Sequence, residues 1–259
     1  MQDQMEQHDI RIGRDKFYEL LRRNNLLIIK RKRRPMTTNS NHPLRKYDDL
    51  VKGYEPVVAH QVWVSDITYI RVQNEWNYVA FITDAYSRKV VGFNVNDRMD
   101  AAFCVQALQQ ALAQLPEQHQ LIHHSDRGLQ YCSKAYTDIL TARGIRISMT
   151  QTSDPRDNAI AERVNGIFKD EFEMNRTFDS LEQARSEIAR MVETYNEQRP
   201  HGSCDNLTPK VAHHKQGVLD KTWTSRTKKQ PLPIKMHTPK TSVNLIQDSS
   251  LHCQPSSVI

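Results

Sequence analysis

Cysteine is scarce in this sequence. No Cys-x-x-Cys pair occurs among the four thiol residues, which are Cys104, Cys132, Cys204 and Cys253. This spacing argues against a disulfide framework and against a compact zinc site. We therefore predict free thiols in a reducing compartment, which is the cytoplasm.

Long apolar runs are also absent. The sequence has no stretch of about 18 apolar residues, the length needed to cross a bilayer. The first thirty residues are polar and charged, so a secretory leader is not predicted either. With 38% hydrophobic and 25% charged residues, the 259-residue chain has the composition of a globular protein. Its length suits one catalytic domain with appendages, or two small domains.

Positive charge is concentrated at the two ends of the chain. Residues 11–46 contain 12 Lys and Arg against two acids, and residues 216–259 contain six against two. The stretch between them, 47–215, has a net charge of −5, although the whole chain carries +6. Basic arms attract phosphate backbones and clustered acids can hold cations, so this distribution predicts a polyanionic partner.

Residues 1–56 predict a basic helix followed by a linker. Residues 14–28 place four apolar residues at roughly helical spacing, and a basic run and a polar stretch without periodicity come after them. We interpret this segment as a DNA-binding part. Its predicted DNA contacts are Arg22, Arg23, Lys30, Arg31, Lys32, Arg33 and Arg34.

The body, residues 57–215, predicts an α/β fold with a mixed sheet flanked by helices. The first three expected strands, joined by short links typical of antiparallel neighbours, are 61–72, 77–85 and 88–95. The following alternation of helix and strand predicts parallel additions to the same sheet. Its elements are a helix at 100–114, a strand at 120–126, a helix at 133–143 and a strand at 146–150.

Two long helices are expected to close the body, at 157–173 and 180–197. Beyond them, residues 216–259 are rich in Thr, Ser, Lys and Pro and have only scattered apolar residues. This composition predicts a basic tail that is disordered or partly extended.

Two carboxylates are distinguished by their places in this pattern. Asp66 lies inside an otherwise apolar strand, where a charge is costly unless it is paired or binds a metal. Asp126 ends a short apolar strand, and Gly128 permits a tight turn after it. Because open α/β sheets place ligand sites beyond the carboxyl ends of their strands, we predict both as site residues.

A third carboxylate is selected by helical geometry. In the helix expected at 157–173, Glu162 and Lys169 point nearly opposite to the apolar stripe. Asn158 lies one turn before Glu162 and shares its face. That face suits a metal at one end and a phosphate further along.

Other residues of this stretch have alternative explanations. Asp154, before Pro155, is better explained as a helix cap, and Asp157 as a first-turn charge that favours the helix dipole. Gly166 costs about 1 kcal/mol relative to Ala in a helix interior. We therefore expect a close approach at Gly166, either by a nucleic-acid backbone or by a packing helix.

Three carboxylates without thiol ligands suit Mg²⁺ or Mn²⁺ rather than zinc. Two such ions, roughly 3.5–4 Å apart, could activate a water or a DNA 3′-hydroxyl and stabilise the leaving oxygen. The tandem His123 and His124 would point to opposite faces of a short strand. We interpret them as structural rather than as ligands.

Five blocks of the sequence, in order, resemble the integrase catalytic core of bacterial insertion-sequence transposases. They are WVSDITYI (63–70), FITDAYSRKVVG (81–92), HHSDRGLQY (123–131), SDPRDNAIAERVNGIFKDEF (153–172) and YNEQRPH (195–201). Asp126 and Glu162 are separated by 35 residues, as in the DDE pattern of that family, and Lys169 falls seven residues after Glu162. The resemblance covers about residues 57–210.

The resemblance implies a ribonuclease-H-like fold with a catalytic, metal-binding triad of Asp66, Asp126 and Glu162. Ahead of the core, it implies that residues 1–56 contain part of a helix-turn-helix. It also implies an enzyme that cleaves DNA and transfers strands at the ends of an insertion sequence, with two Mg²⁺ or Mn²⁺ ions. The expected DNA contacts in the core are Lys169, Asn158 and Arg163. Asp84 lies in a block of the family outside its triad, and we interpret it as structural.

The implied partners are DNA, further copies of the chain, and an upstream-frame helix-turn-helix polypeptide, as in transposases read from a second reading frame. The expected location is the bacterial nucleoid. Two alternatives stay open from the sequence. One is a DNA-binding remnant or regulator of transposition without catalysis, and the other is a nuclease that cleaves RNA–DNA hybrids.

Overall fold

The computed structural model describes residues 5, 10–27, 42–151 and 158–221. Several sequence predictions fall outside these residues. They concern the basic run from Lys30 to Arg34, Asp154 and Asp157, Cys253, and the tail from residue 222 onward.

Near the N-terminus, α2 (Arg14–Arg23) buries Phe17 and Leu21 and exposes its two final arginines. The helix is shorter than the predicted span of 14–28. The chain turns at Asn25, whose φ of 54° is left-handed, a conformation that asparagine tolerates after a helix. The Leu26 N–H then donates back to the Leu21 carbonyl.

Three antiparallel strands begin the body, as the short links predicted. They are β1 (Val62–Val72), β2 (Glu75–Asp84) and β3 (Val90–Asn96). In this register Asp66 of β1 lies opposite Phe81 of β2. At Asp66, β1 is therefore paired with β2 on one side.

Parallel strands extend the sheet on the other side of β1. β4 (Ile122–Ser125) pairs with β1, and β5 (Arg146–Met149) pairs with β4. The strand order is β3-β2-β1-β4-β5, and the two-residue β6 (Thr177–Phe178) pairs with the far end of β1. The structure confirms the predicted mixed sheet and adds β6.

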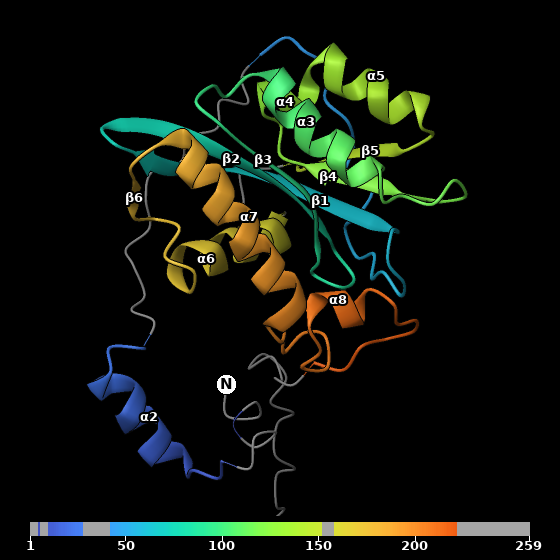
Figure 1. The fold of residues 1–259 in the computed structure, drawn as a ribbon. Coiled ribbons are helices and arrows are strands. Elements are labelled where there is room, and N and C mark those ends of the chain that lie inside the picture. Colours follow the sequence, from blue (N-terminus) through green and yellow to red (C-terminus); the bar gives the residue numbers. More distant parts are fainter. Residues whose placement is uncertain (1–4, 6–9, 28–41, 152–157, 222–259) are drawn as a thin grey trace, which may run out of the picture. The chain divides into compact units, whose positions relative to one another are not determined.

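Helices cover both faces of this sheet (Figure 1). On one face lie α3 (Ala101–Leu112), α4 (Leu129–Cys132) and α5 (Lys134–Ala142). On the other lie α6 (Ala159–Asp170) and α7 (Leu181–Gln198), and α8 (Pro209–Ala212) contacts α7. The four-residue helices α4 and α8 were not predicted.

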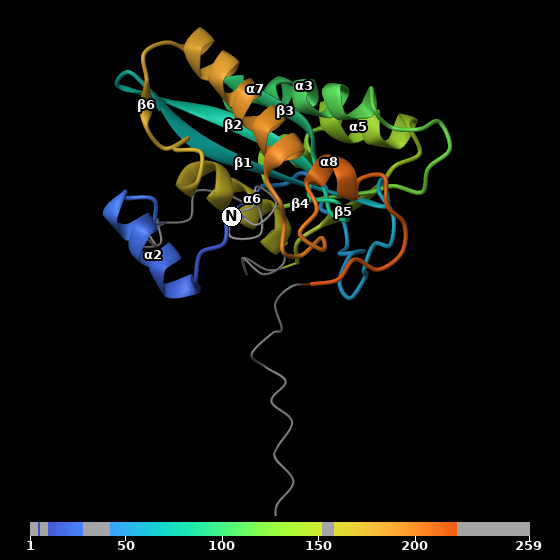
Figure 2. The same ribbon diagram turned by 60° about the horizontal axis from the view of Figure 1, so that its bottom comes forward.

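Each face of the sheet has its own hydrophobic core, and Figure 2 shows β1 between the two helical layers. Trp63 and Leu108 belong to the core beneath α3 and α5. Phe81 stacks on Phe168 beneath α6 and α7, with ring centroids 4.6 Å apart. Because β1 is covered on both faces, a buried polar side chain on either face of this strand needs a hydrogen-bonding partner within the protein.

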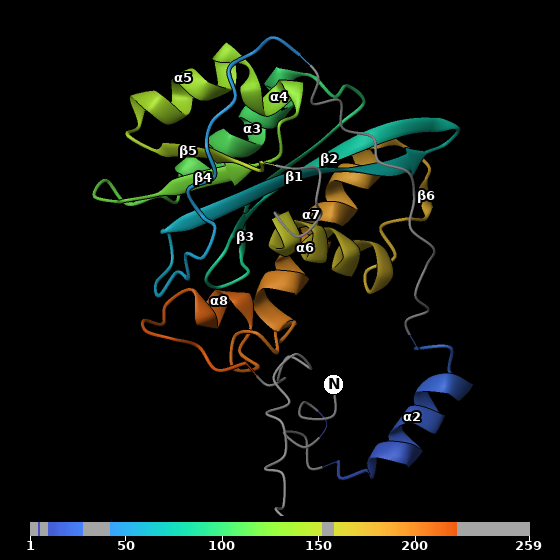
Figure 3. The ribbon, with the colours of Figure 1, turned by 180° about the vertical axis from the view of Figure 1, so that it is seen from behind.

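The segment ahead of β1 runs beside the edge strand β5, as the blue trace in Figure 3 shows. The Met149 N–H donates to the Asp48 carbonyl, and the Leu50 N–H donates to the Ser148 hydroxyl at 2.8 Å. We call residues 42–51 the strap. It occupies the main-chain N–H of Met149 in β5, and it also binds the Ser148 side chain of that strand.

No helix in the described part of the chain is both long and apolar enough to cross a membrane. Cys104, Cys132 and Cys204 are buried free thiols. Burial is the main reason why the pKa of the Cys132 thiol rises to about 11. The predicted absence of disulfides holds for these three residues.

Candidate active site

Asp66 and Asp126 come together through the parallel pairing of β1 and β4. The last paired residues are Val64 and His124. Each aspartate lies two residues beyond its strand's member of that pair, so the same register places the two carboxylates side by side. Position in neighbouring strands, the feature used in the sequence prediction, thus accounts for their meeting.

The charge state of Asp66 reflects this arrangement. Its pKa is raised to about 7, first by burial, then by the negative charge of Asp126, and to a smaller extent by that of Glu162. The Ile67 N–H and the Asn165 side chain act in the opposite direction. Both other carboxylates of the predicted triad therefore act electrostatically on Asp66, which is favourable for binding a cation there.

The loop that carries Asp126 is fixed from two sides. Oδ1 of Asp126 accepts a hydrogen bond of 2.9 Å from the Gly128 N–H, which closes the tight turn expected there. Nε2 of His42 in the strap lies 2.7 Å from the carbonyl oxygen of Arg127. The strap therefore contacts the residue that directly follows Asp126.

Helix α6 is joined to β1 by two side-chain amides. Nδ2 of Asn165 donates to Oδ2 of Asp66 at 2.7 Å, and Nδ2 of Asn158 donates to the Ser65 carbonyl at 3.0 Å. Both asparagines are buried, and neither Oδ1 atom has a donor among the described residues. The role predicted for Asn158, a DNA contact, stays a prediction, and the structure adds a role in holding α6 against β1.

Glu162 lies in the first turn of α6 and is exposed. Helix α6 begins at Ala159 rather than at residue 157, so Asn158 precedes the helix. Among the described residues, no three carboxylate, imidazole or thiolate groups converge closely enough to hold one metal ion. In the described part of the chain, the predicted triad is therefore not assembled into one three-ligand metal site.

The predicted DNA contacts on α6 face different surroundings. Arg163 is exposed, whereas Lys169 in the last turn is half-buried. In α2, Arg22 and Arg23 are exposed, and Arg23 forms an ion pair of 2.6 Å with Glu19. Their contacts with DNA stay predictions.

The two histidines of β4 have structural partners. Nε2 of His123 lies 2.7 Å from the Ser65 hydroxyl and 2.9 Å from the Tyr136 hydroxyl. Nδ1 of His124 lies 2.9 Å from the Ser148 hydroxyl. Both side chains are buried, because helices or loops cover both faces of the sheet. Their hydrogen bonds agree with the structural interpretation.

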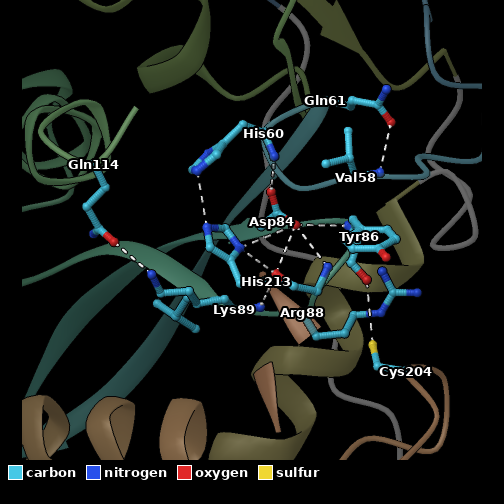
Figure 4. A network of polar contacts seen from close by, with 12 residues as sticks. Val58, His60, Gln61, Asp84, Tyr86, Arg88, Lys89, Gln114, Cys204 and His213 are labelled. Carbon is cyan, nitrogen blue, oxygen red and sulfur yellow. Dashed lines mark hydrogen bonds and ion pairs between the residues drawn. The ribbon is translucent and has the colours of Figure 1, made fainter. Parts of the chain in front are cut away.

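Asp84 ends β2 and is the centre of a separate buried network, shown in Figure 4. Its carboxylate accepts hydrogen bonds from the N–H groups of His60, Tyr86 and Ser87 and from the Ser87 hydroxyl. Since that hydroxyl proton goes to Asp84, Nδ1 of His213 donates to Ser87 Oγ at 2.9 Å. These hydrogen bonds agree with the structural interpretation of Asp84, the aspartate outside the predicted triad.

Sequence reasoning missed Asn165. It lies on the buried side of α6, three residues after Glu162, where the apolar pattern leaves an amide unexplained. A buried amide within one turn of a predicted ligand was the available signal, because such a group requires a hydrogen-bonding partner.

A family model described as an integrase core domain matches residues 57–155, and a second model of the same description matches residues 143–209. Together these ranges contain Asp66, Asp126 and Glu162. The matched stretch agrees closely with the extent of the resemblance found in the sequence.

Two relatives come from Shigella sonnei. The chain is 34% identical over 217 residues to the 31 kDa protein of insertion element IS600. This alignment covers 83% of this chain and 80% of that protein. The chain is also 32% identical over 197 residues to the transposase for insertion sequence element IS629. This second alignment covers 76% of this chain and 66% of that protein.

One solved structure is similar in fold, the cryo-EM structure of the simian T-cell lymphotropic virus intasome in complex with the PP2A regulatory subunit B56 gamma. The TM-score is 0.52 at 20% sequence identity, and the match covers 78% of this chain and 67% of that chain. The mixed open sheet flanked by helices is the ribonuclease-H-like fold that was predicted.

Proposed function

Because the chain belongs to the insertion-sequence transposases with an integrase core, we propose that it cleaves DNA at the ends of an insertion sequence and joins those ends to a target in a metal-dependent reaction. The family supports a role in DNA transposition. The observation that carries the finer proposal is the pairing of Asp66 with Asp126, because the charge of Asp126 raises the pKa of Asp66.

Asp66, Asp126 and Glu162 would hold the metal. Their donor set fits Mg²⁺ or Mn²⁺, since these cations prefer carboxylate oxygens. Two such ions would supply Lewis-acid stabilisation of the attacking and leaving oxygens in an in-line phosphoryl displacement.

Other residues of the chain would orient the ligands and the DNA. Asn165 fixes one oxygen of Asp66, and the Gly128 N–H fixes one oxygen of Asp126. Ordered ligands lower the cost of assembling the site when substrate arrives. Lys169 and Arg163, on the same helix as Glu162, would contact DNA phosphates.

The test is a strand-transfer assay with a labelled duplex of the element end, a target plasmid and Mg²⁺. Asp66→Asn, Asp126→Asn and Glu162→Gln should each lower product by about 100-fold or more, because each removes a charge that the transition state requires. Asp97→Asn, in an exposed loop, is the matched control. Equal product from wild type and Asp126→Asn would overturn the proposal.

A second candidate is a DNA-binding regulator without catalysis. The observation that favours it is the exposed position of Glu162, together with the lack of a converged three-ligand set among the described residues. Salt-sensitive binding to the element end, with no metal-dependent product at any protein concentration, would establish this candidate instead.

We propose DNA as the partner of this chain, whether it acts as a transposase or as a regulator without catalysis. Transposition joins two element ends, so the active form would be a multimer of this chain on DNA. An upstream-frame helix-turn-helix polypeptide would supply further contacts to the ends. Cross-linking of the chain on a duplex with two labelled ends tests for the multimer. Co-purification from cells that express both reading frames tests for the upstream-frame polypeptide.

A further inference from the structure

The strap, residues 42–51, reaches the loop of Asp126 through the main chain of Arg127. Nε2 of His42 lies 2.7 Å from the Arg127 carbonyl oxygen. A carbonyl oxygen only accepts hydrogen bonds, so the Nε2–H of His42 is the donor. The contact therefore holds the main chain of the residue that directly follows a proposed metal ligand.

One peptide group joins His42 to the carboxylate of Asp126. The Arg127 carbonyl and the Gly128 N–H belong to the same planar unit. That N–H donates to Oδ1 of Asp126 at 2.9 Å, while the carbonyl accepts from His42. Because the unit is rigid, its carbonyl and its N–H turn together. Loss of the hydrogen bond at the carbonyl therefore loosens the donor that holds Asp126.

The side chain of Arg127 is tied to the strap as well. Its Nη2 donates to Oε1 of Gln151 at 2.8 Å, and Nε2 of Gln151 donates to the Tyr47 carbonyl at 3.2 Å. The Tyr47 ring is itself anchored, because it packs against the core beneath α3 and α5. The strap therefore holds Arg127 by its main chain and, through Gln151, by its side chain.

The strap also reaches the chain ahead of Asp126. The Leu50 N–H donates to the Ser148 hydroxyl at 2.8 Å, and Nδ1 of His124 lies 2.9 Å from the same hydroxyl oxygen. His124 precedes Asp126 by two residues. The strap is therefore linked to both sides of Asp126, through Ser148 before it and through His42 after it.

His42 touches the loop of Asp126 directly, whereas Tyr47 and Leu50 reach it through one further residue. We propose that His42 is a positioning residue for Asp126, which it holds through a single peptide group. This inference rests on the proposed function, in which Asp126 binds a metal ion. A carboxylate that is already oriented loses less freedom when the ion binds. Loss of such an outer contact usually costs about 10- to 100-fold in metal affinity or activity.

Three substitutions separate the hydrogen bond from the shape of the side chain. His42→Phe keeps a ring and removes the donor, whereas His42→Gln places an amide N–H near the position of Nε2. His42→Asn, whose amide is too short to reach the carbonyl, replaces His42→Phe if that variant does not fold. The controls are Leu44→Ala, at an exposed strap residue, and His214→Phe, at an exposed histidine after α8.

The first test measures metal binding without DNA. Mn²⁺ should raise the thermal unfolding midpoint of wild type, because a cation that binds only the folded state stabilises it. Asp126→Asn should diminish this rise. In His42→Phe, the Mn²⁺ concentration needed for the wild-type rise should be about 10-fold higher. His42→Gln and the two controls should respond to Mn²⁺ as wild type does.

The second test is strand transfer at varied Mg²⁺ and varied DNA concentration. His42→Phe should lower the rate at saturating DNA by about 10-fold, and excess Mg²⁺ should restore part of it. The KM for the element-end duplex should stay unchanged, because His42 orients a metal ligand and does not bind the DNA. A raised KM with an unchanged rate at saturation would make His42 a DNA contact and would overturn the proposal.

The Mn²⁺ response also separates positioning from a merely structural role. A lower midpoint in metal-free buffer, with the wild-type rise at each Mn²⁺ concentration, would show that His42 only stabilises the fold. Equal weakening of the response in His42→Phe and His42→Gln would likewise overturn the proposal, since the donor would then be irrelevant. If wild type binds Mn²⁺ and transfers strands while the His42 variants match it, only this inference fails. If wild type does neither, the proposed function itself fails.

Discussion

The side-chain amide of Asn165 donates a 2.7 Å hydrogen bond to Oδ2 of Asp66, and this contact joins the helix of Glu162 to the strand of Asp66. The two carboxylates, which we propose as catalytic, come from sequence positions almost a hundred residues apart. A single amide between their elements therefore sets part of their relative position.

Asn165→Ala should lower strand transfer by about 10- to 100-fold, the usual effect of removing a group that orients a metal ligand. We also expect the Mg²⁺ concentration for half-maximal activity to rise, because Asp66 is no longer fixed. The measurement is a Mg²⁺ titration of the strand-transfer rate, with Asn74→Ala in the exposed β1–β2 turn as control. A variant with unchanged Mg²⁺ dependence would show that the hydrogen bond is only structural.

Asp84→Ala should lower the free energy of unfolding by about 3–5 kcal/mol, because it leaves several buried donors without an acceptor. Asp84→Asn should lose less, since its amide oxygen still accepts. Urea unfolding measures both. Asp97→Ala, at an exposed carboxylate, should stay within about 0.5 kcal/mol of wild type. A midpoint for Asp84→Ala equal to that of the control would contradict the structural role of this network.

His123→Gln should flatten the acid side of the stability profile. Burial lowers the pKa of His123 to about 3, whereas an unfolded histidine titrates near 6.5. Between these values the unfolded state binds the extra proton, so stability falls as the pH falls. From pH 7.5 to pH 5 this group costs on the order of 2 kcal/mol.

The raised pKa of Asp66 acts in the opposite direction and is shared by both proteins, so it cancels in the comparison. Urea unfolding at the two pH values should therefore show a smaller acid loss in His123→Gln than in wild type. Parallel profiles for the two proteins would exclude His123 as a source of acid sensitivity.

Gly92→Ala and Gly166→Ala should change stability in opposite directions. A Cβ at Gly92 would lie 2.3 Å from the Ala107 carbonyl oxygen of α3, so the helix must shift, at a cost of about 1–3 kcal/mol. A Cβ at Gly166 meets no described atom within 4 Å, and alanine should gain about 0.5–1 kcal/mol in the helix. Thermal unfolding distinguishes the two.

Gly166 also bears on DNA. A packing helix does not explain this glycine, because the space beside it is open in the described structure. If a DNA backbone approaches there, Gly166→Ala should bind the element end more weakly although it is more stable. Equal DNA affinity in wild type and Gly166→Ala would leave the close approach without support.

Regular patterns in the sequence predicted the sheet well. Short links between the expected strands predicted the antiparallel pairing of β1, β2 and β3. The elements that were missed, α4, α8 and β6, have four, four and two residues. Segments of that length contain too few residues to show a helical or strand period.

Part of the site was predictable for the same reason. Asp66 and Asp126 meet because their strands are parallel neighbours, and alternating helices and strands imply such pairing. Contacts made by single side chains across long sequence distances leave no periodic trace. Asn165 and Asp66 are one example, and Arg88 with Ser203 is another.

The strap has a consequence for how the catalytic core can be handled. An open sheet edge offers a row of N–H and carbonyl groups to any other chain, which promotes aggregation. Residues 42–51 cover this edge at β5. Shortening the chain to the start of β1 would remove that cover along with the segment that we predict to bind DNA. The boundary of a well-behaved core therefore lies ahead of the strap, near residue 42.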